Sequence, residues 1–458
     1  MDHGIRPSFY NYITALPNGE RLLFNFYTLN LMVVKPEDVP DVERLLAHSE
    51  VTTSSEQTKE LQELLVQKGF IIDADIDERD LLRQSHYASV TQRDQLTLTI
   101  APTLDCNFRC VYCYQHRSRG GMTPEVEEAV LRFTEEQLAE EGILYIVWFG
   151  GEPLLQMDVI ERLTKGLRAI CERKKSRYSA RIITNAYLLD AACVERLLGC
   201  DVSSAQVTLD GPADVHDARR PTKNGRPTFS RILNNLIEAS QRMNISVRMN
   251  VDQRNQDRIL DLMDILKEKG LREKVGFYLG KTYPYTDVCA DVATCCIGDM
   301  EFNLLSLETL MDMVEQGFTS LFNMPTSHDH HCVADCEHTY VITPTGGLAK
   351  CWNEIDSPDA WCGHLLEPLT TAMLEIKRRW QSIDPFEREC ADCLLLPICM
   401  GGCPYVLGLT GERDCHPWKH HIDESLVFYY FFKEEERQVT IARHFQTIVQ
   451  SVKELANK

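Results

Sequence analysis

Six short apolar runs alternate with amphipathic stretches from residue 96 onward, and this alternation limits the possible folds more than any other feature. Each run has the length of one strand, and the stretches between them repeat apolar residues at helical spacing. Strands that alternate with helices form a parallel sheet with right-handed crossovers. We therefore predict an α/β fold, a partial (β/α)6 TIM barrel, with its ligand site at the carboxyl ends of the strands. The six runs are Leu96–Ala101, Ile143–Phe149, Ala180–Thr184, Ala205–Leu209, Ile245–Val251 and Val275–Leu279.

Two of the intervening stretches have clear helix signals. Pro124–Glu140 follows Thr123, a residue type that caps helix N-termini, and proline is favoured at the first helical position. Thr228–Met243 places Ile232 and Leu236 on one face. Both stretches are therefore predicted to be helices that cover the sheet.

The chain on either side of this barrel differs from it in composition. Residues 1–92 contain no cysteine, whereas 328–418 are rich in Cys, Gly, Pro and His, which is the composition of a small domain held by metal. In the first segment we expect extended chain over Leu22–Val34 and helices over Pro36–His48, Glu56–Lys68 and Asp77–His86. The predicted domains are 1–92, winged-helix-like; 93–327, the barrel; 328–418, the cysteine-rich domain; and 419–458, a tail with one or two helices from Asp423.

Charge and cysteine content exclude several classes of protein. The 458 residues carry a formal net charge of −20, which argues against a nucleic-acid backbone as the main partner. No run approaches the roughly 18 apolar residues that span a membrane, and no signal peptide is visible at Met1, so we expect a cytoplasmic protein without a membrane partner. With 18 cysteines in close-spaced groups, such a chain is expected to bind metal rather than form disulfides.

Three of these cysteines directly follow the first predicted strand. Cys106, Cys110 and Cys113 have the spacing C-x3-C-x2-C in one loop. Soft thiolate ligands select iron–sulfur clusters or zinc. Three thiolates suit a cubane cluster whose fourth iron stays open to an outside ligand, and a three-cysteine zinc site is the alternative.

With an aromatic residue, Tyr112, just before its last cysteine, this loop resembles that of the radical S-adenosylmethionine (SAM) enzymes. The resemblance covers roughly residues 93–418. It implies a [4Fe–4S] cluster on Cys106, Cys110 and Cys113 whose open iron chelates the amino and carboxylate groups of SAM. It further implies that one electron cleaves SAM to a 5′-deoxyadenosyl radical.

Other residues at predicted strand ends resemble the SAM contacts of that family. Gly150 and Gly151 allow a close backbone approach, and the carboxylate of Glu152 is expected to accept from the SAM ammonium group. The stretch from Thr208 to Arg220 resembles the family's motif for the SAM carboxylate and ribose. The full set of expected SAM contacts is Tyr112 (against the adenine), Gly150, Gly151, Glu152, Asn185, Thr208 and Arg220, with Arg248 and Asn250 as weaker candidates.

The cysteine-rich segment matches the spacing of the SPASM domain, which follows certain radical SAM barrels and carries two auxiliary [4Fe–4S] clusters. The spacing is Cys336-x9-Gly346-x4-Cys351, then C-x2-C-x5-C-x3-C from Cys390, then Cys415. Two structural zinc sites are the alternative. The resemblance implies a first cluster on Cys336, Cys351 and Cys403, with Cys332 as a fourth ligand or an open iron in its place. It implies a second cluster on Cys390, Cys393, Cys399 and Cys415.

The resemblance implies that a ribosomally made precursor peptide is modified by hydrogen abstraction and oxidative thioether or carbon–carbon crosslinking. A flavodoxin- or ferredoxin-type protein would be the reductant, and residues 1–92 would bind the leader of the peptide. Formylglycine formation in a sulfatase is the alternative, but maturases of that type carry an aspartate where Trp352 follows Cys351 here. Glu354 and Asp356 are weak candidates for a base. An iron–sulfur electron carrier without radical chemistry is a second alternative.

Overall fold

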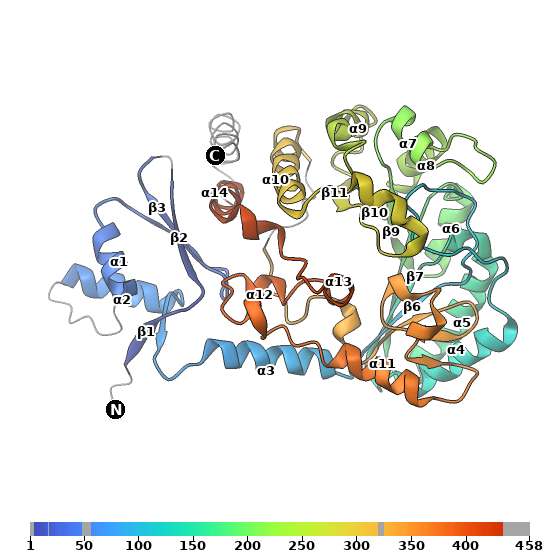
Figure 1. The fold of residues 1–458 in the computed structure, drawn as a ribbon, viewed down its shortest axis with the longest axis horizontal. Coiled ribbons are helices and arrows are strands. Elements are labelled where there is room, and N and C mark those ends of the chain that lie inside the picture. The colour runs from blue at the N-terminus through green and yellow to red at the C-terminus, as the bar shows by residue number, and fades with distance from the viewer. Residues whose placement is uncertain (1–3, 17, 48–55, 319–324, 434–458) are drawn as a thin grey trace.

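A nine-stranded sheet organises the computed structural model, which describes residues 4–16, 18–47, 56–318 and 325–433 (Figure 1). Its strands follow the order β11-β10-β9-β8-β7-β6-β12-β13-β14, and β6 to β11 run parallel. The predicted α/β fold with a parallel sheet of the partial-barrel type is therefore confirmed. The parallel strands are β6 (Gln95–Ile100), β7 (Ile143–Trp148), β8 (Arg177–Thr184), β9 (Val202–Thr208), β10 (Asn244–Val251) and β11 (Val275–Lys281).

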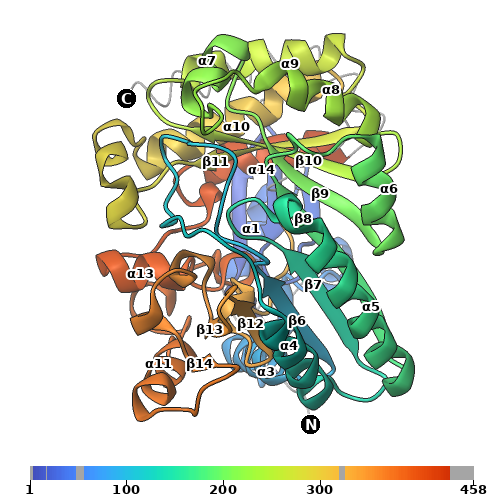
Figure 2. The ribbon, with the colours of Figure 1, turned by 90° about the vertical axis from the view of Figure 1, so that its right-hand side faces the viewer.

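Helices connect these strands and cover the outer face of the sheet, as Figure 2 shows for α4 and α5 beside β6 and β7. The predicted cap is present, because the Thr123 side chain accepts from the backbone N–H of Val126. The first helix ends earlier than predicted, since Leu138 adopts an extended backbone. The helices are α4 (Pro124–Gln137), α5 (Met157–Lys174), α6 (Ala191–Gly199), α7 (Ala213–Arg219), α8 (Phe229–Ala239), α9 (Ile259–Glu268) and α10 (Asp299–Glu315).

The cysteine-rich segment continues the barrel's sheet, which the sequence did not predict. Strand β12 (Thr339–Ile342) pairs parallel with β6, and β13 (Gly347–Ala349) and β14 (Gly363–His364) add antiparallel strands beyond it. This pairing joins residues more than 230 positions apart, which no local pattern reveals. The segment and the tail also contain α11 (Thr371–Gln381), α12 (Leu396–Cys399), α13 (Pro404–Thr410) and α14 (Ile422–Lys433).

The N-terminal segment forms two small sheets, drawn at the left of Figure 1. One pairs β1 (Ile5–Pro7) with β5 (Ile71–Asp73), and the other contains β2 (Asn11–Ala15), β3 (Arg21–Asn25) and β4 (Leu31–Val34). The predicted extended stretch is thus a hairpin of β3 and β4. The helices are α1 (Val39–Ala47), α2 (Glu56–Gln67) and α3 (Glu78–Thr91), which is longer than predicted. Residue 48 of the first predicted helix and residues 434–458 of the tail lie outside the described residues.

The three-stranded sheet has two covered faces. Leu23 on one face packs with Val42 of α1 and Leu65 of α2. On the other face, Phe24 meets Tyr429 of α14 with ring centroids 5.8 Å apart. This second face shares one apolar cluster with α10, α14 and the cysteine-rich segment, so the N-terminal sheets pack on that segment.

Among the described residues, none of the helices combines the length and the apolar character that a membrane crossing requires.

Candidate active site

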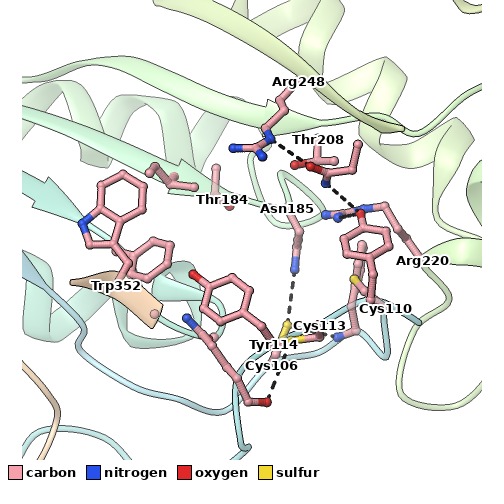
Figure 3. Close-up of a pocket in the computed structure, with 18 of the residues that line it drawn as sticks. Cys106, Cys110, Cys113, Tyr114, Thr184, Asn185, Thr208, Arg220, Arg248 and Trp352 are labelled. Carbon is pink, nitrogen blue, oxygen red and sulfur yellow. Dashed lines mark hydrogen bonds between the residues drawn. The ribbon is translucent and has the colours of Figure 1, made fainter. Parts of the chain in front are cut away.

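One cavity lies at the carboxyl ends of the parallel strands, and the thiols of Cys106, Cys110 and Cys113 line it together (Figure 3). Its volume is about 210 Å³. Of the other residues expected at a SAM site, Tyr112, Gly150, Gly151, Asn185, Thr208, Arg220, Arg248 and Asn250 also line it. The structure thus brings the three cysteines and eight of these nine residues to one place. Glu152 is the exception.

The three-cysteine loop is held by the segment that follows α7. Arg109 N–H donates to the Pro221 carbonyl at 2.8 Å, and Val111 N–H donates to the Arg219 carbonyl at 3.0 Å. Phe108 forms an isolated bridge to Thr222 and is fully buried. These backbone bonds fix a loop that has no regular secondary structure of its own, so the three thiols have defined positions.

The thiols are free and at least partly buried. Burial raises the pKa of Cys106 to about 12, and the nearby Glu152 carboxylate raises it further. Burial also raises the pKa of Cys110 to about 11, while Arg220 opposes this. At neutral pH the bare thiols of Cys106 and Cys110 would keep their protons, and a bound metal would stabilise their thiolate forms. The backbone N–H of Phe108 lies 3.4 Å from Cys106 Sγ and is placed to stabilise such a thiolate.

Two glycines let a second loop pack directly against the cysteine loop. Gly150 has a φ of +115°, and a Cβ there would lie 2.3 Å from the Thr103 carbonyl oxygen. A Cβ at Gly151 would lie 2.3 Å from the Asp105 carbonyl oxygen. Side chains are therefore excluded at both positions, and the backbone itself forms this wall of the cavity.

The carboxylate of Glu152 is directed away from the cavity and is fully buried. One oxygen accepts from Leu154 N–H at 3.0 Å and from Thr184 Oγ1 at 2.7 Å, and the other accepts from Asn185 N–H at 2.8 Å. Burial raises the pKa of Glu152, and these hydrogen bonds lower it. In the structure, the hydrogen bonds of this carboxylate to Thr184 and Asn185 hold the end of β8 in place. Its expected contact with the SAM ammonium group stays a prediction.

A buried hydrogen-bond network centres on the Tyr112 hydroxyl. It donates to Asp210 Oδ2 at 2.5 Å and accepts from Arg220 Nη1 at 2.6 Å and Asn250 Nδ2 at 3.1 Å. Burial raises the pKa of Tyr112 well above its ordinary value. The hydroxyl is thus fully engaged, and the ring is the part of Tyr112 that remains available to a ligand. Arg220 Nε is buried without a hydrogen-bond partner.

Arg219 supports this network, and sequence reasoning missed it. Its guanidinium contacts Asp252 Oδ2 at 2.8 Å and Asp210 Oδ2 at 3.5 Å, and all three side chains are almost completely buried. A buried cation between two buried carboxylates compensates charges that would otherwise be costly. The adjacent pair Arg219-Arg220 could have indicated this role in the sequence. Two neighbouring side chains point in different directions, so only one of the two arginines can face the cavity.

Two further parts of the wall were not predicted. Thr282, Tyr283 and Tyr285 follow β11 and line the cavity opposite the glycine loop. Trp352, in a short 3-10 helix directly after Cys351, packs against Phe149 with ring centroids 5.1 Å apart and the ring planes tilted by 34°. The cysteine-rich segment therefore contributes an indole to the barrel's cavity.

Comparison with protein families gives the decisive observation: residues 100–295 match the model described as the Radical SAM superfamily. This region of the chain belongs to the radical SAM superfamily.

Curated relatives of this radical SAM chain differ in how much they share with it. The cysteine-type anaerobic sulfatase-maturating enzyme of Clostridium perfringens (strain 13 / Type A) is 22% identical over 364 residues, 73% of this chain and 93% of the relative. The Fe-coproporphyrin III synthase of Methanosarcina barkeri (strain Fusaro / DSM 804) is 27% identical over 180 residues. That match covers 38% of this chain and 42% of the relative.

A solved structure, native anSMEcpe with bound AdoMet and Cp18Cys peptide, has the same fold. Its TM-score is 0.57 at 19% identity, and the match covers 76% of this chain and 99% of that one. The likeness therefore extends beyond the barrel.

In this radical SAM chain, the two candidate bases lie outside the cavity. Glu354 pairs with Arg379 at 2.9 Å, and burial raises its pKa while Arg379 lowers it. Asp356 accepts from the backbone N–H of His116, and the His116 ring lies 3.3 Å from the same carboxylate. Both carboxylates are therefore engaged in contacts between segments, and Asp356 contacts the loop that follows Cys113.

Eight of the nine cysteines in the cysteine-rich segment lie in two neighbourhoods. Burial raises the pKa of Cys351 well above its ordinary value, and the nearby Cys332 and Cys403 raise it further. Burial likewise raises the pKa of Cys332, and the nearby Cys403 and Cys336 raise it further. In the second neighbourhood, Cys390 and Cys399 are each influenced by Cys393 and Cys415. Such influence falls with distance, so Cys332 lies near Cys336, Cys351 and Cys403, whereas Cys390 and Cys399 lie near Cys393 and Cys415.

A second cavity of about 500 Å³ adjoins the first. It lies between the barrel, through β11 and α10, and the SPASM-type segment around α13. Arg248, Lys281, Tyr283 and Tyr285 line both cavities. A molecule that occupies the second cavity would therefore reach the site of the three thiols at these four residues.

Proposed function

We propose that this radical SAM enzyme modifies a ribosomally synthesised precursor peptide by hydrogen abstraction, followed by oxidative formation of a thioether or carbon–carbon crosslink. The observation that carries the proposal is the single cavity that contains three free thiols, a glycine-only backbone wall and the buried Arg220. The adjoining second cavity supports a substrate larger than a metabolite.

Cys106, Cys110 and Cys113 are proposed to hold a [4Fe–4S] cluster, and the donor set fits this group. Three soft ligands, with the Phe108 N–H directed at one sulfur, match the environment of a cluster thiolate. When bound, the cluster would supply the electron that converts SAM to a 5′-deoxyadenosyl radical. The backbone of Gly150 and Gly151 with Asn185, Thr208 and Arg220 would hold SAM, while Glu152 fixes the end of β8.

The chain's own residues would control where the radical acts. Tyr114, Phe149 and Trp352 form an aromatic wall that excludes water from the reacting atoms. The network of Tyr112, Asp210 and Arg220 holds one side of the SAM pocket rigid, because each polar group in it is fixed by another. A rigid pocket decides which substrate hydrogen faces the radical.

Two auxiliary [4Fe–4S] clusters are proposed for the two cysteine neighbourhoods, with Cys332 as the fourth ligand of the first. A backbone donor at one sulfur and a side-chain donor at another support this assignment. Ala334 N–H lies 3.5 Å from Cys332 Sγ, and Lys419 Nζ lies 3.4 Å from Cys415 Sγ. Positive and N–H groups beside a thiolate favour a bound cluster. The clusters would offer a route for the two electrons that crosslinking removes from the substrate.

Formylglycine formation is a second candidate, because a sulfatase-maturating relative aligns with 73% of this chain. The residues of the cavity argue against formylglycine formation. Trp352 occupies the position directly after Cys351, and no Asp or Glu is among the residues that line the first cavity. A crosslinking reaction on a peptide is therefore the better fit. The N-terminal sheets are proposed to bind its leader, and a flavodoxin- or ferredoxin-type protein to supply electrons.

The test is anaerobic reconstitution of the full chain, reduction, and addition of SAM. We expect 5′-deoxyadenosine above background and a change in the cluster's paramagnetic spectrum on SAM addition. Absence of the nucleoside would instead favour an electron carrier. Co-expression with a short Cys-rich open reading frame beside the gene then tests the reaction, since each crosslink should remove two hydrogens from the mass of the peptide.

A further inference from the structure

The two cavities meet at a positively charged wall. Among the residues that line the first cavity, four are cationic: Arg117, Arg220, Arg248 and Lys281. No aspartate or glutamate is among the residues that line this cavity. SAM would bring one carboxylate, but it also brings an ammonium group and a sulfonium group. Even with the small net negative charge of a cluster held by three thiolates, the cavity therefore has more positive charge than the carboxylate of SAM would balance.

Three of these four cations either have a partner in the protein or face solvent. Lys281 pairs with Asp299, which lines the second cavity. Arg220 donates to Tyr112 and lies beside Cys110, where it opposes the effect of burial on the pKa of that thiol. Arg117 is exposed to solvent. Arg248 remains, and no ion pair to a carboxylate involves it within the described residues.

Arg248 is nevertheless held in a defined position. Its Nε donates to Asn250 Oδ1 at 2.8 Å. Its guanidinium lies over Gly280, where a Cβ would come within 2.2 Å of Nε. The two Nη groups have no acceptor in the described part of the chain. Figure 3 shows Arg248 across the cavity from the three cysteines. This side chain is thus fixed by its inner nitrogen and leaves its outer ones for a ligand.

Thr282 supplies an independent sign of a ligand at this wall. It is only 4% exposed and lines the first cavity, yet its hydroxyl has no hydrogen-bond partner. Residues two apart on a strand share a face, so Thr282 continues the face on which Arg248 crosses Gly280. A buried hydroxyl without a partner is costly unless a ligand satisfies it.

We propose that Arg248 and Thr282 form a subsite that binds a carboxylate of the peptide substrate, either an acidic side chain or a C-terminal carboxylate. This inference rests on the proposed function. A guanidinium with two free Nη groups recognises a carboxylate in bidentate geometry, and the hydroxyl adds a third hydrogen bond. Arg248 lines both cavities and Thr282 lines the first, so the subsite would hold the substrate beside the radical.

The SAM carboxylate is not the partner of Arg248 in this proposal. A carboxylate that chelates the cluster has to lie next to the three cysteines, where Arg220 and not Arg248 is found (Figure 3). The sequence had placed Arg248 among the weaker SAM contacts, and the experiment separates the two assignments.

The test uses the full, cluster-reconstituted, SAM-saturated protein and three synthetic peptides. Ac-Ala-Gly-Asp-Gly-Ala-NH2 carries a side-chain carboxylate, its Asn twin carries none, and the Asn peptide with a free C-terminus carries a terminal one. Calorimetry should give at least about 10-fold tighter binding for one of the two carboxylate peptides than for the Asn twin. Which of the two binds identifies the source of the carboxylate.

Variants assign this preference to the subsite. Arg248→Met should reduce the ratio of the two binding constants, carboxylate peptide over Asn twin, to near one. Thr282→Val should reduce this ratio by about 2- to 3-fold. Arg248→Lys should keep part of the preference. Arg242→Met is the matched control, since Arg242 lies on the surface, paired with Glu195. Thermal unfolding checks that each variant is folded.

Equal binding of all three peptides, or no detectable binding of any, would overturn the inference. So would an Arg248→Met protein that binds SAM weakly but keeps the peptide ratio, because that result assigns Arg248 to SAM. SAM binding by the wild-type protein is measured separately through the cluster's paramagnetic spectrum. A failure there refutes the proposed function, whereas normal SAM binding with no peptide preference refutes the subsite alone.

Discussion

The barrel and the cysteine-rich segment 328–418 are stabilised in different ways. In the barrel, Leu98, Ile146 and Val207 belong to one large apolar cluster and are completely buried. In the cysteine-rich segment the elements are short, and buried side chains such as Trp418 beside it pack in a cluster shared with the N-terminal sheet and α14. Burial of apolar surface stabilises the barrel without a ligand.

The segment lacks such a core of its own, and its cysteine thiols are partly or fully buried in two groups. Metal binding adds directly to the folding free energy of a domain of this kind. The barrel is thus a self-sufficient scaffold, whereas the segment relies on packing against its neighbours and, in our proposal, on metal bound by its cysteines. The following predictions test that difference, in order of decreasing effect.

The largest effect is expected from removing the cysteines of the barrel. Replacing Cys106, Cys110 and Cys113 with Ala should abolish 5′-deoxyadenosine formation, because no ligands for the SAM-binding cluster remain. Three full clusters correspond to about 12 irons per chain, and the variant should keep about 8 of them. Nucleoside analysis and iron determination measure both outcomes. Loss of all iron in this variant would show that the two regions are not independent.

Removing a buried charge should destabilise the barrel strongly. Arg219→Met leaves Asp210 and Asp252 buried without their cation, which costs about 3–5 kcal/mol. Urea unfolding followed by far-UV circular dichroism measures the change in the free energy of unfolding. Arg242→Met, which breaks only a surface pair, should change it by about 0.5 kcal/mol or less. Equal effects of the two variants would contradict the role assigned to Arg219.

A substitution in the apolar cluster shared by the N-terminal sheet and the cysteine-rich segment should destabilise both of these regions. Phe24→Ala removes a fully buried ring that packs on Tyr429, at a cost of about 3 kcal/mol. If the cysteine-rich segment relies on this packing, its backbone amides should exchange faster with solvent while those of β7 and β8 stay protected. Hydrogen exchange measured by mass spectrometry separates the two regions. Unchanged exchange in 328–418 would show that this segment is stabilised without the N-terminal sheet.

The smallest effect concerns pH and His216. Burial lowers the pKa of His216 well below its ordinary value of 6.5, and Arg220 and Arg219 lower it further. Below pH 6.5 the unfolded chain binds a proton that the folded chain refuses, so stability falls as pH decreases. The loss approaches about 1.4 kcal/mol per pH unit. His216→Asn should lose less stability than the wild type between pH 7 and 5, and equal losses would contradict this assignment.

Local patterns in the sequence determined most of the barrel and of the cluster loop. Apolar runs of strand length, the Thr123 cap and the spacing of Cys106, Cys110 and Cys113 depend on neighbouring residues only, so they can be read along the chain. The residues expected to contact SAM also lie near one another, because parallel strands bring their carboxyl ends to one edge.

Only the tertiary structure decided where each side chain points. The pairing of β12 with β6, the entry of Trp352 into the cavity, the inward turn of the Glu152 carboxylate and the choice of Arg219 for the buried network all join segments far apart in sequence. Such contacts depend on the competition among many distant partners for the same buried space and hydrogen bonds. No periodicity or spacing in a single segment records the outcome of that competition.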